Sequence, residues 1–382
     1  MSVFSDGGKL SIAVTCASGV ERVLKKELSR IGVQDAPAVN GRIEFSGDAL
    51  TVARCNLNLR TADRVYVKAG EFVATDFDAL FDAVTEIPWE EYLEKDGNFT
   101  VVGKSVKSKL FALSALQSVI KKAIALRLGK AYGLKHLPEN GAKREIRFSL
   151  YGDLCSLFIN TSGEGLHKRG YRDLVGIAPI KETLASAILL MSDFYKDRPL
   201  YDPFCGSGTF VIEGARIALG IAPGINRKFA FNEWKNFPEK AYASAVEEAK
   251  DKIRRDVKLD FRGSDIDGKA VALAKRHAER AGVGGAVSFK RLAVSDFVPN
   301  SDCGTVVTNP PYGERVIGKK EARECAVSLG NALKDFCGWS AFVITSDDSF
   351  EKYFGKKAER RRKLFNSEKE CYLYYYYGKK EI

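Results

Sequence analysis

Hydrophobic and polar positions follow two rhythms along the chain. In the first 160 residues, short alternating runs typical of half-buried strands are interleaved with segments whose apolar residues recur every three or four positions, as in amphipathic helices. This pattern predicts strands at 9–15, 42–45, 65–71 and 98–102, and helices at 18–31, 48–56, 76–84 and 110–128. Two successive α+β units are therefore expected.

Two further strands are predicted at 145–151 and 154–159, joined by Gly152-Asp153, which favours a two-residue hairpin turn. The segment that follows, 161–172 (TSGEGLHKRGYR), is polar and rich in glycine. We interpret this segment as a linker.

After the linker, apolar strands alternate with amphipathic helices, which is typical of a doubly wound parallel sheet. Strands are predicted to end at Asp202 and to run over 260–265, 287–292, 305–308 and 339–345, with helices at 181–195, 209–219, 269–281 and 321–336. Segments 361–365 and 371–377 can pair across Asn366-Ser367, so an antiparallel hairpin is expected to close the sheet.

Positive charge is concentrated rather than spread evenly. The chain carries a formal charge of +11, and the stretch from Lys104 to Arg147 holds eleven basic and two acidic residues. A second basic cluster lies at 352–363. One such run is usually a solvated helix face, but two favour a polyanion such as nucleic acid as partner.

The remaining composition narrows the class of protein. No apolar run approaches the roughly 20 residues of a membrane span, and the eight scattered cysteines form no CxxC pair. We therefore expect a cytoplasmic protein with reduced thiols, no membrane partner and no metal. The oligomeric state is not indicated.

A glycine-containing turn, Asp202-Pro203-Phe204-Cys205-Gly206-Ser207-Gly208-Thr209, follows one strand and opens a helix. Open α/β sheets bind ligands at this position. The next strand ends in Asp265-Ile266-Asp267, and a carboxylate there can accept both ribose hydroxyls of an adenosine-containing cofactor. NAD is a competitor at this point, although the turn lacks the GxGxxG spacing.

A second motif, Asn309-Pro310-Pro311-Tyr312, follows the apolar strand 305–308. The side-chain oxygen of Asn309 and the carbonyl of Pro310 can each accept one N–H of an exocyclic amino group, and the prolines stiffen the turn. Tyr312 offers a flat face for a base rotated out of its stack. The motif thus indicates methylation of a nucleobase amino group.

Taken jointly, seven motifs resemble those of the THUMP-containing class I RNA methyltransferases, in particular the bacterial 23S rRNA guanine-N2 methyltransferases. They are HKRGYR (167–172), APIKETLA (178–185), YDPFCGSGTFVIE (201–213), IAPGINR (221–227), GSDID (263–267), TNPPYGER (308–315) and RKLFNSEKECYLY (362–374). The resemblance implies a ferredoxin-like domain at 1–64, a THUMP domain at 65–162 and a Rossmann-like class I catalytic domain at 163–382, with a helical insertion at about 220–259. The chain is expected to depart from the longest members of that family in one respect, because no second methyltransferase domain is expected to follow.

The resemblance also implies roles for individual residues. S-adenosylmethionine is the expected cofactor, with its methionine part held by 202–209, its ribose by Asp265 beside Ile266 and Asp267, and its adenine by Asp296. Pro179, Lys181 and Glu182 would lie against the cofactor, and Asn309 would face both cofactor and base. Structured RNA, 23S rRNA rather than tRNA, is the expected partner. Its candidate contacts are Lys104, Lys107, Lys109, Lys121, Lys122, Arg127, Lys143, Arg144, His167, Lys168 and Arg169.

Two alternatives stay open on the sequence alone. The Asn-Pro-Pro-Tyr motif serves adenine as well as guanine, so N6-adenine methylation of DNA or RNA is a rival activity. A THUMP-type RNA-binding or assembly protein with an idle catalytic domain is the second rival. The intact cofactor turn, Asp265 and residues 309–312 argue against the idle domain.

Overall fold

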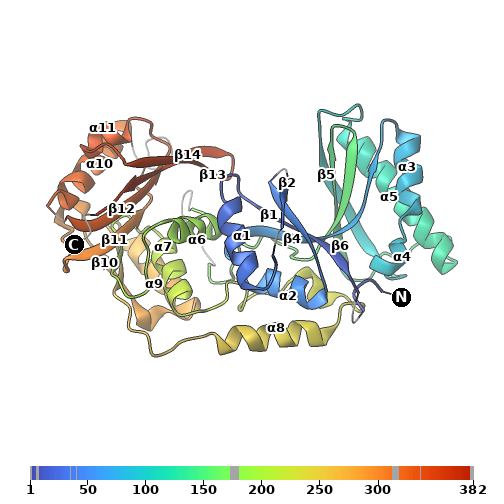
Figure 1. Cartoon of the computed structure of the whole chain (residues 1–382), viewed down its shortest axis with the longest axis horizontal. Coiled ribbons are helices and arrows are strands. Elements are labelled where there is room, and N and C mark those ends of the chain that lie inside the picture. Colours follow the sequence, from blue (N-terminus) through green and yellow to red (C-terminus); the bar gives the residue numbers. More distant parts are fainter. Residues whose placement is uncertain are drawn as a thin grey trace.

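The computed structural model describes residues 2–5, 8–34, 36–39, 41–172, 180–311, 318–335 and 337–378. Within this part of the chain the strands form two sheets of seven strands each. Figure 1 shows an elongated molecule, in which the sheet of the C-terminal half lies at one end and the sheet of the N-terminal half extends from the middle to the other end.

The first sheet has the order β2-β3-β1-β4-β7-β6-β5. Its strands are β1 (Leu10–Cys16), β2 (Ala38–Val39), β3 (Arg42–Gly47), β4 (Ala62–Val73), β5 (Asn98–Val106), β6 (Lys143–Tyr151) and β7 (Leu154–Asn160). Its helices are α1 (Glu21–Arg30), α2 (Ala49–Asn58), α3 (Phe77–Glu86), α4 (Trp89–Tyr92) and α5 (Leu113–Tyr132). Asp48 and Asp76 cap α2 and α3, because their side chains accept hydrogen bonds from the backbone N–H groups of Thr51 and Ala79 in the first turn.

Strand β4 joins the two N-terminal units into one sheet. It pairs with β1 through its first half and with β7 through its second half. The expected boundary between residues 64 and 65 therefore lies inside a strand. The β6–β7 hairpin is as predicted, since Gly152 and Asp153 both take positive φ angles, 56° and 65°.

The second sheet has the order β10-β9-β8-β11-β12-β14-β13 and confirms the predicted fold class. Its strands are β8 (Leu200–Asp202), β9 (Phe261–Asp265), β10 (Val287–Arg291), β11 (Cys303–Thr308), β12 (Gly338–Thr345), β13 (Arg360–Asn366) and β14 (Lys369–Tyr376). Strands β8 to β12 are parallel to one another, and the β13–β14 hairpin closes the sheet antiparallel to β12. The accompanying helices are α6 (Glu182–Met191), α7 (Thr209–Ala218), α9 (Gly268–Arg280), α10 (Lys319–Leu333) and α11 (Phe350–Phe354).

The stretch between α7 and β9 reaches back to the N-terminal half of the molecule. It contains the 3-10 turn η1 (Ala230–Glu233) and α8 (Glu239–Asp251), which runs beneath α2 in Figure 1. Gly224 donates a backbone hydrogen bond to Leu57, and Arg54 of α2 pairs with Glu248 of α8. The long stretch thus fastens the catalytic sheet to the first unit.

Segment 161–172 is not the solvated linker that its polar composition predicts. Thr161, Ser162 and Tyr171 are fully buried, and Arg169 is buried beside the carboxylate of Glu213 on α7. The hydroxyl of Tyr171 donates a hydrogen bond to the same carboxylate. The buried polar groups of this segment therefore have partners inside the protein, whereas its polar composition predicts that they contact solvent. The segment is an interlock between the two halves.

No helix of the described residues has the length and apolar character needed to cross a membrane.

Candidate functional site

The turn after β8 provides an open glycine loop at the carboxyl edge of the second sheet. Gly206 has a φ of 50°, and a Cβ placed on it would meet no atom within 4 Å, so the space above its backbone is open. Gly208 has a φ of 83°, and its Cβ would lie 3.0 Å from Ala274 and Phe289. Gly208 is thus required for close packing, and Gly206 leaves the backbone accessible to a ligand.

Asp202 is buried at the start of this loop. Its Oδ1 accepts hydrogen bonds from the hydroxyl of Thr308 at 2.6 Å and from the backbone N–H of Phe204 at 3.2 Å. Burial raises the pKa of the Asp202 carboxyl from 3.8 to about 7. The Thr308 bond holds the end of β11 against the loop, so residue 309 lies beside it.

Asp265, at the end of β9, is tied to the same loop. One carboxylate oxygen accepts the N–H of Gly206 at 2.9 Å and the other accepts the N–H of Asp267 at 2.9 Å. Each oxygen retains a lone pair for a further donor. The neighbouring Ile266 side chain is 69% exposed, although it is apolar. A diol acceptor beside an exposed apolar residue fits the ribose and adenine of an adenosine-containing cofactor.

The other predicted site residues follow neighbouring strands. Asp296 lies in the 3-10 turn η3 (Val294–Asp296) after β10, and Asn309 to Pro311 follow β11. Since β8 to β11 are parallel, the ends of these strands meet at one edge of the sheet. Asn309 is half-buried and Pro310 is buried. Pro179 and Tyr312 lie outside the described residues.

The start of α6 lies next to the loop through Arg172. The guanidinium of Arg172 pairs with Glu182 at 3.2 Å and donates to the hydroxyl of Thr209, the first residue of α7. Burial raises the pKa of the Glu182 carboxyl. Lys181 precedes Glu182 and is partly exposed. The structure therefore brings Lys181 and Glu182 to the same edge as the loop.

The candidate RNA contacts divide into surface and buried groups. Lys104, Lys107, Lys109, Lys122, Lys143 and Lys168 are exposed, and Lys121 and Arg127 are partly exposed, with Arg127 paired to Glu90. Arg144 is 1% exposed because it lies against the ring of Trp234 and pairs with Glu94. Arg169 is 2% exposed. The prediction is wrong for these two arginines, which hold the domains together.

His167 is partly exposed, but it is a poor cationic contact at neutral pH. Burial, followed by the nearby charges of Lys181 and Arg169, lowers the pKa of His167 from 6.5 to about 4. A neutral imidazole can still donate or accept a hydrogen bond.

Two contacts of the site were not foreseen from the sequence. Thr308 reads as the last residue of a strand, and its bond to Asp202 depends on strand order. His277, which no sequence motif singles out, is buried with Nδ1 3.3 Å from the Ser207 carbonyl. Its position three residues after Ala274 on the apolar face of α9 is the signal that indicates burial.

Three family models match the chain in succession. Residues 11–66 match a model described as "RlmL ferredoxin-like domain", residues 74–160 match "THUMP domain", and residues 169–374 match "RMKL-like, methyltransferase domain". The chain belongs to the RlmKL-like methyltransferase family. Membership of this family confirms the predicted cofactor class, S-adenosylmethionine.

Relatives of this RlmKL-like chain carry related names. The chain is 41% identical to "Putative RNA methyltransferase YpsC" of Bacillus subtilis over 97% of both chains. It is 37% identical to "Ribosomal RNA large subunit methyltransferase K/L" of Allochromatium vinosum, where the match covers 92% of this chain and 49% of the relative. The chain thus spans about half the length of that K/L protein.

Solved structures share the whole fold. A "predicted N6-adenine-specific DNA methylase" from Listeria monocytogenes superposes with a TM-score of 0.94 and 42% identity over 99% of both chains. "SMU.472, a putative methyltransferase complexed with SAH" superposes with a TM-score of 0.93 and 40% identity, covering 98% of this chain and 99% of that one.

Proposed function

We propose that this RlmKL-like protein acts on RNA and transfers a methyl group from S-adenosylmethionine to the exocyclic N2 amino group of a guanosine, in 23S rRNA, in the cytoplasm. The observation that carries the proposal is the buried hydrogen bond of 2.6 Å between Thr308 and Asp202. It fixes the Asn-Pro-Pro turn beside the open glycine loop, so an amino-group acceptor and a cofactor loop lie on adjacent strands.

The cofactor residues follow from the same geometry. When bound, S-adenosylmethionine supplies an electrophilic methyl group. The 202–209 loop would hold its methionine part, and Asp265 would accept the ribose hydroxyls. Ile266 would cover one face of the adenine, and Asp296 would accept its amino group. Asp202 acts at least in part by positioning, because its Oδ1 accepts both the hydroxyl of Thr308 and the N–H of Phe204.

The Asn-Pro-Pro-Tyr turn acts on the nucleophile. The N2 lone pair of guanine is delocalised into the ring, which makes the nitrogen a weak nucleophile. Asn309 Oδ1 and the Pro310 carbonyl would each accept one N–H and turn the nitrogen toward a tetrahedral arrangement. As the new C–N bond forms, this nitrogen becomes acidic and releases one proton, so no strong base is required. Tyr312 would stack on the target base.

Support for RNA comes from the N-terminal half. A THUMP model matches residues 74–160, and the two relatives named above are called an RNA and a ribosomal RNA methyltransferase. The K/L name favours 23S rRNA, the RNA of the large subunit. A second candidate function is N6 methylation of adenine. The name of the Listeria structure favours it, and the Asn-Pro-Pro-Tyr turn can accept the amino group of adenine as well as that of guanine.

The test is mass spectrometry of nucleosides after unmodified 23S rRNA transcripts, tRNA or DNA is incubated with the protein and labelled S-adenosylmethionine. We expect labelled N2-methylguanosine from 23S rRNA alone. The variant Asn309→Ala should have a kcat about 10²–10³-fold lower than that of the wild type, while its affinity for the cofactor stays near the wild-type value. Labelled N6-methyladenosine would establish the second candidate instead, and full activity of Asn309→Ala would remove the turn from the mechanism.

A further inference from the structure

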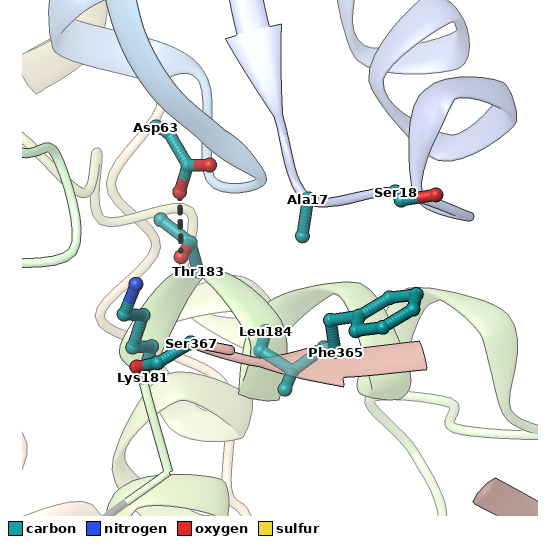
Figure 2. Close-up of a pocket in the computed structure, with 8 residues that line it drawn as sticks. All are labelled: Ala17, Ser18, Asp63, Lys181, Thr183, Leu184, Phe365 and Ser367. Carbon is teal, nitrogen blue, oxygen red and sulfur yellow. Dashed lines mark hydrogen bonds between the residues drawn. The ribbon is translucent and has the colours of Figure 1, made fainter. Parts of the chain in front are cut away.

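A cavity of about 400 Å³ lies between the N-terminal unit and the catalytic edge of the second sheet. Figure 2 shows Ala17 and Ser18, which follow β1, on one wall, and Leu184 and Phe365 on the facing wall. A volume of this size is within the range of small-molecule sites, roughly 300–1,000 Å³. Its remaining lining residues are Asp63, Lys181, Thr183 and Ser367.

The cavity opens beside the proposed reaction site. Thr345 at the end of β12 pairs with Tyr372 near the start of β14, so the β13–β14 turn with Ser367 lies at the same sheet edge as Asn309. Lys181 and Thr183 belong to the start of α6, which Arg172 links to Thr209 of the cofactor loop. A nucleotide in the cavity would therefore be near the target base without occupying the cofactor loop.

The two walls are fixed to each other. Arg362 on β13 donates to the backbone carbonyl of Gly19, directly after the Ala17–Ser18 wall. A Cβ on Gly19 would lie 3.1 Å from the carbonyl oxygen of Lys363. On the other side, the hydroxyl of Thr183 lies 3.5 Å from Asp63 Oδ1. Four segments that are distant in the sequence, around residues 17–19, 63, 181–184 and 362–367, thus build one preformed space.

The lining combines the groups that recognise an unpaired nucleotide. Phe365 offers an aromatic ring and Leu184 an apolar floor, which suit base stacking. Asp63 offers carboxylate oxygens to N–H groups on the Watson–Crick edge of a base. The ammonium of Lys181 lines the space, and that of Lys363 lies 5.4 Å from the centre of the Phe365 ring. Lys181 is therefore placed to neutralise a phosphate, whereas Lys363 is paired with Glu370.

We propose that this cavity is a second nucleotide-binding site, which holds an unpaired RNA nucleotide adjacent to the target guanosine and selects its base through Asp63. The inference rests on the proposed function. A base that presents two neighbouring N–H donors, as guanine does, matches the two oxygens of Asp63 best. The N-terminal unit then contributes directly to the choice of the methylated position, in addition to general affinity for RNA.

The test uses the full-length protein and an RNA transcript that contains the mapped target guanosine with two randomised nucleotides on each side. Sequencing of the methylated fraction should show that the wild type prefers one base at one flanking position. Asp63→Asn should reduce that preference at least tenfold. Phe365→Leu should raise KM for RNA about tenfold, because stacking on the ring is lost, and Phe365→Tyr should restore it. The affinity for S-adenosylmethionine should be unchanged in all three variants.

Unfolding temperatures serve as the control for folding, because Asp63 and Phe365 also lie at an interface. An unchanged flanking preference in a folded Asp63→Asn variant would overturn the inference. So would a parallel loss of cofactor affinity, which would assign the cavity to the cofactor. Wild-type protein that forms no N2-methylguanosine in any RNA would refute the proposed function and with it this inference, and the two failures are thereby distinguished.

Discussion

At the scale of single residues, Asp265 has a structural role and, in the proposed function, a binding role. Its oxygens already accept the N–H groups of Gly206 and Asp267 and still face the open loop. We predict that Asp265→Asn, which keeps one acceptor oxygen but removes the charge, lowers the affinity for S-adenosylmethionine by at least tenfold, since a charge-assisted hydrogen bond contributes about 1.5–3 kcal/mol. Isothermal calorimetry measures this change. The control Asp260→Asn, directly before the same strand at its other end, should bind normally, and equal affinities would exclude Asp265 from the site.

Asp202 makes stability depend on pH. Its pKa is about 7 in the folded protein, against 3.8 for an ordinary exposed aspartate. Between these values the folded state binds a proton that the unfolded state has lost, so this carboxyl lowers stability progressively as pH rises from about 4 to 7. Asp202→Asn should therefore stabilise the fold at pH 8 by roughly 2–4 kcal/mol and by little at pH 4.

Thr308→Val provides the opposite change at the same place. It removes the donor that favours the charged form of Asp202, so its destabilisation should grow from pH 4 to pH 8. Unfolding temperatures of the wild type and both variants across this pH range decide the matter. Parallel curves would show that Asp202 does not titrate in the range.

Sequence motifs placed the glycine loop, Asp265 and residues 309–311 at the ends of strands, where the structure has them, because each motif depends on a strand end followed by particular residue types. Their binding and catalytic roles stay predictions. What the sequence did not indicate depends on contacts between distant segments. Arg144 is basic and lies in a basic stretch, yet the ring of Trp234, 90 residues later, covers it. Charge along the chain cannot distinguish a buried arginine from an exposed one.

At the scale of elements, hydrophobic periodicity predicted helices and strands well, whereas segment 161–172 shows its limit. This segment has no periodicity, so its burial follows from partners such as Glu213 on α7. We predict that Glu213→Ala destabilises the protein by about 3–5 kcal/mol, because it leaves the guanidinium of Arg169 buried without its partner. Denaturant unfolding measures the loss.

Glu164 provides the matched control for Glu213. It lies in the same segment's exposed part and pairs with Lys168 four residues later. Glu164→Ala should change the free energy of unfolding by no more than about 0.5 kcal/mol. Similar losses for both variants would mean that segment 161–172 is not the interlock between the two halves.

At the scale of the whole molecule, one hydrophobic core runs from the N-terminal unit through to the catalytic sheet. The β4 strand, the interlock and the stretch between α7 and β9 all cross between units that the motifs treat as separate. Motifs identify domains by local pattern, so they do not report how much surface the domains bury against each other. The packing between these units thus fixes the position of the THUMP unit relative to the proposed reaction site.

This arrangement places an exposed basic surface away from the catalytic edge, at the far end of β5 and the loop after it. Lys104, Lys107 and Lys109 are exposed there, and Figure 1 shows the THUMP unit at the opposite end of the molecule from the β10–β13 sheet. Reversing all three to Glu should weaken binding of the proposed 23S rRNA substrate at least tenfold. The slope of log affinity against log salt should become shallower by about 0.7–0.9 for each phosphate that the protein no longer neutralises. Fluorescence anisotropy over a salt series measures both quantities.

The control reverses three exposed lysines on or next to α8, Lys240, Lys250 and Lys252, which changes the net charge by the same amount. If RNA attraction depended only on total charge, the two triple variants would lose affinity equally and show the same salt slope. If the THUMP lysines contact phosphates, only their reversal flattens the slope, while the affinity for S-adenosylmethionine stays unchanged in both. The cofactor loop follows a strand of the second sheet, whereas Lys104, Lys107 and Lys109 lie on or after β5 of the first sheet. A loss of cofactor binding in the THUMP variant would therefore indicate misfolding, and it would contradict the separation of RNA binding from the chemical step.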